Sequence, residues 1–174
     1  MRQIQPKQLQ LGEVDIASIQ LDTHSRDDVP QVLFGLQHIY TNKKVRNLIF
    51  SLLEELLPRN VSSINGRPGM HLWRILVLGI LRLNLNWDYD RLREMANQHS
   101  TIRQMLGHGF DDSEQYKLQT IKDNVSLFTP ALLERINDAV VAAGHDVVGK
   151  KRNPIEGALR FLCIRNKCPF PHRP

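Results

Sequence analysis

Two clusters of acidic residues carry side chains that can bind the divalent cations of phosphodiester chemistry. Asp27 and Asp28 form one cluster, and Asp111, Asp112 and Glu114 form the other. Carboxylate oxygens are the ligands that Mg²⁺ and Ca²⁺ prefer in proteins. Residues adjacent in sequence rarely converge on one metal ion, however, and Asp is also typical of turns and helix N-termini. We therefore interpret both clusters as turn and capping residues and expect this chain to hold no metal or other cofactor.

The histidines show no arrangement that indicates nucleophilic catalysis. Five of them, His38, His71, His99, His108 and His145, are scattered along the sequence. We identify no Cys or Ser that would form a nucleophile–base pair with any of these five. No Gly-rich phosphate-binding loop accompanies them. The residue types alone therefore indicate a helical domain without a recognisable active site.

The stretch from Arg91 to Leu106 is the best candidate for nucleic-acid recognition. Ala96 and Ser100 stand four residues apart, as the close contact and the turn of a helix-turn-helix require. The match is partial, because His99 and Thr101 occupy places that usually hold apolar residues and a glycine ends the second helix early. The alternative is a pair of amphipathic helices with solvated arginines.

If this stretch reads DNA, its exposed side chains divide into two groups. Phosphate contacts fix the position of a protein on DNA, whereas contacts with base edges read the sequence. We expect phosphate contacts from Arg91 and Arg93 and base contacts from Thr101, Arg103 and Gln104. Arg67, in the loop that precedes the central helix, is a further candidate for DNA binding.

The hydrophobic periodicity predicts an all-α fold, a compact bundle of six or seven helices. The expected helices span about residues 30–40, 43–57, 70–85, 89–99, 101–106, 114–128 and 130–143. Ser100 and Thr129 are expected N-caps, and Gly144 is expected to end the last helix. Helix 70–85 is apolar on nearly every side and should be the buried centre. Its most buried positions should include Leu72, Ile75, Leu76, Leu78, Gly79 and Ile80.

The distribution of charge divides the chain into three parts. Residues 1–29 are polar and are expected to form an N-terminal arm, and residues 30–149 form the helical domain. The formal net charge is +5, but residues 150–174 hold seven Lys and Arg against one Glu. This last segment is rich in Pro, and its Cys163, Cys168 and His172 fit no common zinc site. We expect a disordered basic tail with reduced thiols.

Hydropathy gives no sign of export or membrane insertion. The most apolar stretch, Leu72 to Leu83, is interrupted by Arg74 and Arg82, and it is shorter than the roughly 20 residues that span a bilayer. The first ten residues lack the apolar core of a signal peptide. We expect a cytoplasmic protein without a membrane partner.

Several separated blocks of the sequence resemble the amino-terminal domain of the ISNCY family of insertion-sequence transposases. The first is Gly-Arg-Pro-Gly-Met-His-Leu-Trp-Arg-Ile-Leu-Val-Leu-Gly at 66–79, followed by Asp-Tyr-Asp-Arg-Leu at 88–92 and Ile-Arg-Gln-Met-Leu-Gly at 102–107. Further matching blocks lie at 25–28, 118–125 and 143–145. The resemblance covers about residues 9–151. The sequence also shows a broader similarity to the InsH-type transposase amino-terminal domain.

The resemblance implies a role in DNA transposition. In the family, an RNase-H-like domain follows the helical one, and its acidic residues hold the Mg²⁺ used for strand cleavage and joining. This sequence ends at Pro174, so we expect a fragment without that DDE domain and without enzymatic activity. Suitable codons for residues 160–174, read in the neighbouring frame, encode a segment similar to the opening strand of the catalytic domain. A frameshift near residues 150–160 would account for the tail, whether it is a mutation or a programmed slippage.

Three interpretations of such a fragment stay open. It can bind the terminal inverted repeats of its element or associate with itself or with full-length transposase subunits. It can act as an inhibitor of transposition through mixed oligomers or competition for DNA ends. It can also be the product of a decayed gene with no function.

Overall fold

The computed structural model describes residues 12–22, 24–56 and 69–148. In this part of the chain the structure is all-helical, with seven α-helices, one short 3-10 helix and no strand. The elements are η1 (Ile16–Ser18), α1 (Asp28–Thr41), α2 (Lys43–Glu54), α3 (Leu72–Asn84), α4 (Tyr89–Gln98), α5 (Ser100–Met105), α6 (Leu118–Val125) and α7 (Pro130–Val148). The predicted all-α fold is therefore confirmed. Arg67 and the expected tail at 150–174 lie outside the described residues.

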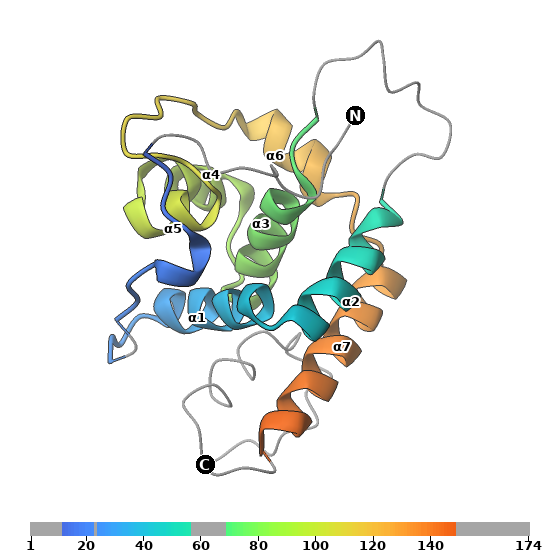
Figure 1. The fold of residues 1–174 in the computed structure, drawn as a ribbon. Helices are drawn as coiled ribbons and strands as arrows, with labels where there is room; N and C mark the ends of the chain where they lie inside the picture. Colours follow the sequence, from blue (N-terminus) through green and yellow to red (C-terminus); the bar gives the residue numbers. More distant parts are fainter. Residues whose placement is uncertain (1–11, 23, 57–68, 149–174) are drawn as a thin grey trace.

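Helix α3 forms the centre of the domain (Figure 1), where it contacts α1, α2, α4 and α6. An unbroken run from Ile75 to Leu81 is buried. Such a helix, apolar on every face, lowers its free energy only when neighbours surround it. The six positions that the sequence predicted as most buried are all buried in the structure.

Glycine at position 79 allows one of these neighbours to approach closely. A Cβ atom placed on Gly79 would lie 2.6 Å from Cε2 of Phe128, which follows α6. That distance is far below a van der Waals contact. The phenyl ring therefore occupies the space that any larger residue in the middle of α3 would need.

Short-range capping explains where several helices begin. The Asp27 carboxylate accepts a hydrogen bond from the backbone N–H of Val29, and the Asp88 carboxylate accepts one from Arg91. Thr129 accepts from the backbone N–H of Leu132, as predicted for an N-cap. Each of these oxygens satisfies a backbone donor that the first turn leaves unpaired. The acidic pair at 27–28 is thus a helix start, as expected.

Other predicted boundaries are wrong. Helix α1 begins at Asp28, so Pro30 occupies its third position and not its first. His99, whose ring accepts a hydrogen bond from the backbone N–H of Ile102, is the N-cap of α5, and Ser100 is already the first helical residue. Helix α7 continues through Gly144 to Val148, because a glycine lowers helix stability but does not by itself end a helix.

The described part of the expected N-terminal arm packs on the domain. Ile16 and Ile19 are buried in the common core. The side-chain amide of Gln37 on α1 donates hydrogen bonds to the carbonyls of Ile16 and Ile19, at 2.8 and 3.0 Å. An arm boundary at residue 29 is therefore too late, because the domain begins by η1.

Candidate functional site

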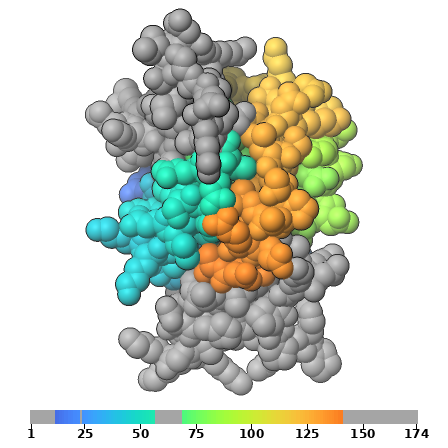
Figure 2. Space-filling model, turned by 90° about the vertical axis from the view of Figure 1, so that its right-hand side faces the viewer, coloured from blue at the N-terminus to red at the C-terminus, as the bar shows by residue number. Residues whose placement is uncertain are grey.

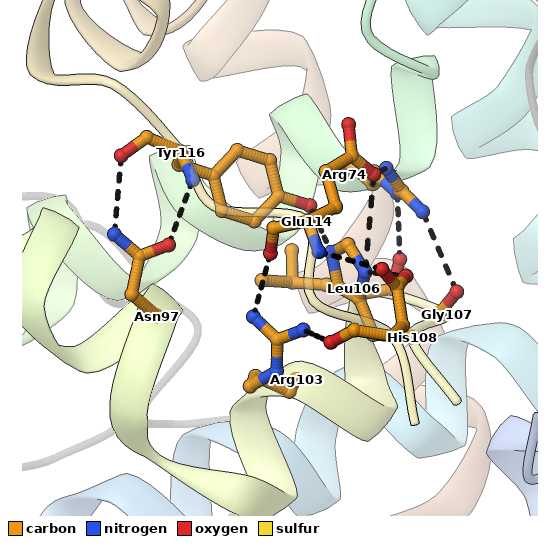
Figure 3. Close-up of polar contacts among 9 residues, drawn as sticks. Arg74, Asn97, Arg103, Leu106, Gly107, His108, Glu114 and Tyr116 are labelled. Carbon is orange, nitrogen blue, oxygen red and sulfur yellow. Dashed lines mark hydrogen bonds and ion pairs between the residues drawn. The ribbon is translucent and has the colours of Figure 1, made fainter. Parts of the chain in front are cut away.

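A cluster of buried and partly buried polar groups surrounds the loop between α5 and α6 (Figure 3). The loop starts at Gly107, whose φ of +77° lies in the left-handed region that glycine adopts without strain. It then runs without regular structure to the beginning of α6 at Leu118. The predicted start of this helix at 114 is wrong, because residues 112–117 have no regular structure and are held by side chains of α3, α4 and α5.

His108 lies at the middle of this cluster, and its side chain is completely buried. Its Nδ1 lies 2.5 Å from Oδ2 of Asp112, and its Nε2 lies 2.6 Å from the hydroxyl of Tyr116. A neutral imidazole satisfies all three groups if Nδ1–H donates to the carboxylate and Nε2 accepts from the phenol. Burial lowers the pKa of His108, and the hydrogen bond with His108 lowers the pKa of Asp112, so both shifts favour this arrangement.

Two arginines hold the backbone of the same loop. Arg103 on α5 donates to the carbonyls of Asp112 and Glu114, at 2.5 and 3.0 Å. Arg74 on α3 donates from Nε to the carbonyl of Leu106 at 2.8 Å, and its Nη1 lies 3.2 Å from Oε2 of Glu114. Hydrogen bonds from a charged donor are stronger than neutral ones. The arginines therefore fix the loop at its start and in its middle.

A third contact comes from α4. The side-chain amide of Asn97 donates to the carbonyl of Tyr116 at 3.1 Å and accepts from its backbone N–H at 2.7 Å (Figure 3). These two hydrogen bonds satisfy both the backbone N–H and the backbone carbonyl of Tyr116. The loop is thus attached to three helices that are themselves packed in the core.

The geometry of the cluster is that of a structural clamp. Tyr116 is only 6% exposed, and burial raises its pKa, so its phenol is a poor nucleophile. His108, Asp112 and Glu114 bring three possible metal ligands within 4.8 Å of one another. The charges of Arg74 and Arg103 already balance the two carboxylates, so a divalent cation would add uncompensated charge. The Asp112 carboxylate instead accepts from His108 and from the backbone N–H of Glu114, as expected for a turn residue.

The structure distributes the expected DNA contacts over different surfaces. Arg91 and Arg93 are exposed on α4, where each pairs with an acidic residue three positions away. Thr101 and Gln104 are partly exposed and, three residues apart, share a face of α5. Arg103 points to the other side and holds the loop, so it is not free to enter a DNA groove.

Helices α4 and α5 form a compact pair, but with unusual proportions for a DNA-reading unit. Ala96 and Ile102 are fully buried where the two helices meet, which agrees with the expected close contact. One residue, His99, joins the helices, and α5 has only six residues. Helix-turn-helix units use a turn of about three or four residues and a longer second helix. The pair therefore matches the motif in its core contact only.

A basic surface that the sequence reading missed lies at the start of α2. Lys43 and Lys44 are exposed, and Arg46 is partly exposed. Within the described residues none of the three makes an ion pair; the Arg46 guanidinium instead donates to the carbonyl of Tyr40 and lies over its ring. We call these three residues the α2 basic patch. A Lys-Lys-x-Arg sequence at a helix start, where acidic residues are usual, is the signal that could have revealed it.

The rest of the described surface makes this patch distinctive. The described residues contain twelve Lys and Arg against seventeen Asp and Glu, so this part of the chain is acidic. Figure 2 shows α2 and α7 side by side on one face of the molecule, with the beginning of α2 at its edge. An exposed ion pair between Arg135 and Glu55 joins the two helices at 2.6 Å.

Neither the hydropathy of the helices nor comparison with other proteins adds a functional assignment to this geometry. No helix in the described part of the chain combines the length and the apolar character needed to cross a membrane. Comparison with protein-family models, with curated proteins and with solved structures finds no match for this chain.

Proposed function

We propose that the helical domain is a DNA-binding unit of an insertion-sequence transposase and that it holds the DNA backbone through the α2 basic patch. The observation that carries this proposal is the position of three cations without ion-pair partners at the start of a helix. There the aligned peptide groups already create a positive potential. Cations at this end weaken the helix and are better explained by attraction for an anion such as a phosphate.

The environment of the patch suits phosphate contacts in particular. The Asn42 side chain accepts from the backbone N–H groups of Lys44 and Val45, so the helix start is already ordered before any ligand binds. Lys43 and Lys44 extend from this rigid start into solvent. Neutralising phosphates with such lysines releases counterions from DNA, which provides most of the affinity at low salt.

The α4–α5 pair supplies the sequence preference in this proposal. Thr101 and Gln104 share a partly exposed face of α5 and are free of the clamp, so they are the candidates for contacts with base edges. Arg91 and Arg93 can exchange their weak exposed ion pairs for phosphates. Arg103 has a structural role. The resemblance places strand cleavage in a different domain, so the activity proposed for these residues is binding to element ends.

Fluorescence anisotropy with labelled duplexes tests the proposal. The probes are the two terminal inverted repeats that flank the gene of this chain and a shuffled duplex of equal length. Lys43→Gln with Lys44→Gln should weaken binding to all duplexes and lower the slope of log K against log salt by about two, close to 0.9 for each lost phosphate contact. Thr101→Ala with Gln104→Ala should instead reduce the preference for the repeats.

A matched control separates the patch from the total charge of the protein. Lys117 is exposed next to α6, and Lys117→Gln removes the same single charge as Lys44→Gln. Binding that falls equally in these two variants would contradict the proposal, because it would show only a dependence on net charge. No measurable binding by the wild-type chain to either repeat would also refute it.

A further inference from the structure

Two large apolar side chains stand out on the described surface, and they lie in opposite electrostatic environments. Phe110 is 78% exposed and Leu48 is 48% exposed. Leu48 lies one helical turn after Lys44, beside the α2 basic patch. Phe110 is followed by Asp111 and Asp112 in the loop between α5 and α6. Leu48 is therefore bordered by positive charge, and Phe110 is bordered by negative charge.

The clamp holds Phe110 outward on a fixed backbone. Its backbone N–H donates to the carbonyl of Gly12, and Gly109 packs so closely on Gly12 that a Cβ atom there would lie 3.1 Å from this carbonyl group. His108 and Asp112, on either side, are fixed by their mutual hydrogen bond. A loop backbone that is fixed before binding loses little further entropy on docking, and a large aromatic side chain is typical of the anchor residues of interfaces.

Phe110 and Leu48 cannot meet within one chain. The loop lies beside α5 at the left of Figure 1, whereas α2 lies at the right, with α1 and α3 between them. Contact between the two surfaces therefore requires two molecules. Because the surfaces differ, such a contact joins copies head to tail, and it leaves one free loop and one free α2 surface at the ends of an open dimer.

We propose that the Phe110 loop of one copy docks on the start of α2 of a second copy. Phe110 then packs against Leu48, and the Asp111 carboxylate, which has no ion-pair partner among the described residues, faces Lys44. The contact covers the α2 basic patch. Where this patch binds DNA, which rests on the function proposed above, self-association and DNA binding exclude each other at that surface.

Sedimentation velocity of the full chain over a range of concentrations at low salt tests the association without reference to DNA. The wild type should associate reversibly, and Phe110→Ser and Leu48→Ser should each weaken this association at least about tenfold. Both side chains are exposed, so neither change disturbs the core. A wild-type chain that remains monomeric throughout, or variants that associate as well as the wild type, would overturn the proposal.

Mixing two deficient variants distinguishes a head-to-tail contact from a symmetric one. Phe110→Ser keeps an intact α2 surface, and Leu48→Ser keeps an intact loop. An equimolar mixture should form dimers with close to wild-type affinity but no larger species, because one complete contact is restored. A symmetric interface between two loops or two α2 helices would leave the mixture as weak as its components, which would refute the proposal.

DNA supplies the final comparison. Phe110→Ser should bind the element ends more tightly than the wild type at protein concentrations where the wild type associates, and equally well at dilution. If the chain associates as proposed but does not bind DNA, the docking inference stands and the DNA function fails. If it binds DNA through α2 and never associates, the outcome is reversed.

Discussion

The hydroxyl of Tyr116 offers the sharpest test of the clamp, because Tyr116→Phe removes one donor and keeps the shape of the ring. The hydroxyl lies 2.6 Å from Nε2 of His108, and both residues are buried, at 6% and 1% exposure. Without the donor, the imidazole nitrogen keeps a buried lone pair that water cannot reach. A lost hydrogen bond that leaves a buried group unsatisfied costs about 1–3 kcal/mol. We expect the free energy of unfolding to fall by about this amount.

Urea unfolding followed by tryptophan fluorescence measures this change close to the site. Trp73 is buried, and its indole N–H donates to the carbonyl of Met105, the last residue of α5, two residues before the loop. Tyr89→Phe is the matched control, since the Tyr89 ring lies under Arg82 but its hydroxyl has no hydrogen bond among the described residues. The control should change stability by less than about 0.5 kcal/mol. An equally small effect of Tyr116→Phe would refute the clamp as a source of stability.

Three further predictions concern the same domain. Gly79→Ala should lower the free energy of unfolding by about 1–3 kcal/mol, because the added methyl group overpacks on Phe128. In a Phe128→Ala background the same change should be neutral or stabilising by up to about 1 kcal/mol, because alanine is the better helix former. Calorimetry of the wild type, the two single variants and the double variant measures this, and equal effects of Gly79→Ala in both backgrounds would contradict it. The lowered pKa of His108 means that the unfolded chain binds more protons, so this contribution to stability should be fully present above about pH 6.5 and decline as the pH falls below it, with a further loss below about pH 3.8 from Asp112. The difference in unfolding free energy between about pH 7.5 and about pH 5.5, measured with urea, should be smaller for His108→Asn than for the wild type. An equal difference would show that other groups cause the decline. Gln37→Ala should raise amide hydrogen exchange in η1 selectively, as measured by mass spectrometry, and unchanged exchange would show that burial alone holds this segment.

The sequence predicted the elements whose signals lie within a short stretch of residues. Helix α3 was recognisable because an apolar residue on every face has only one stable environment, the middle of a core. Asp27, Asp88 and Thr129 cap their helices through oxygens two or three residues from the donors they satisfy, so their roles follow from short stretches of sequence.

The clamp could not be predicted in the same way, because its partners meet only after folding. His108 reaches Asp112 and Tyr116 along an irregular loop, where no helical or strand period relates them. Arg74 reaches the same loop from 32 residues away through its bond to Leu106. The long-range contacts also override local preference in residues 114–117, which the apolar pattern assigned to a helix. For the same reason Arg103 looked like a free cation in sequence although it holds the backbone in space.

The pairing of α2 with α7 has a consequence for synthesis on the ribosome. These two helices make extensive contact, yet α7 begins 76 residues after the end of α2. Until α7 leaves the exit tunnel, the part of α2 that packs on α7 lacks this neighbour, and only α1 and α3 can cover the helix. A nascent chain therefore exposes apolar surface of α2 while residues 55–129 are being added, and the packing of α2 is complete only once α7 has emerged. Any product that terminates before Pro130 should consequently be a substrate for chaperones and proteases.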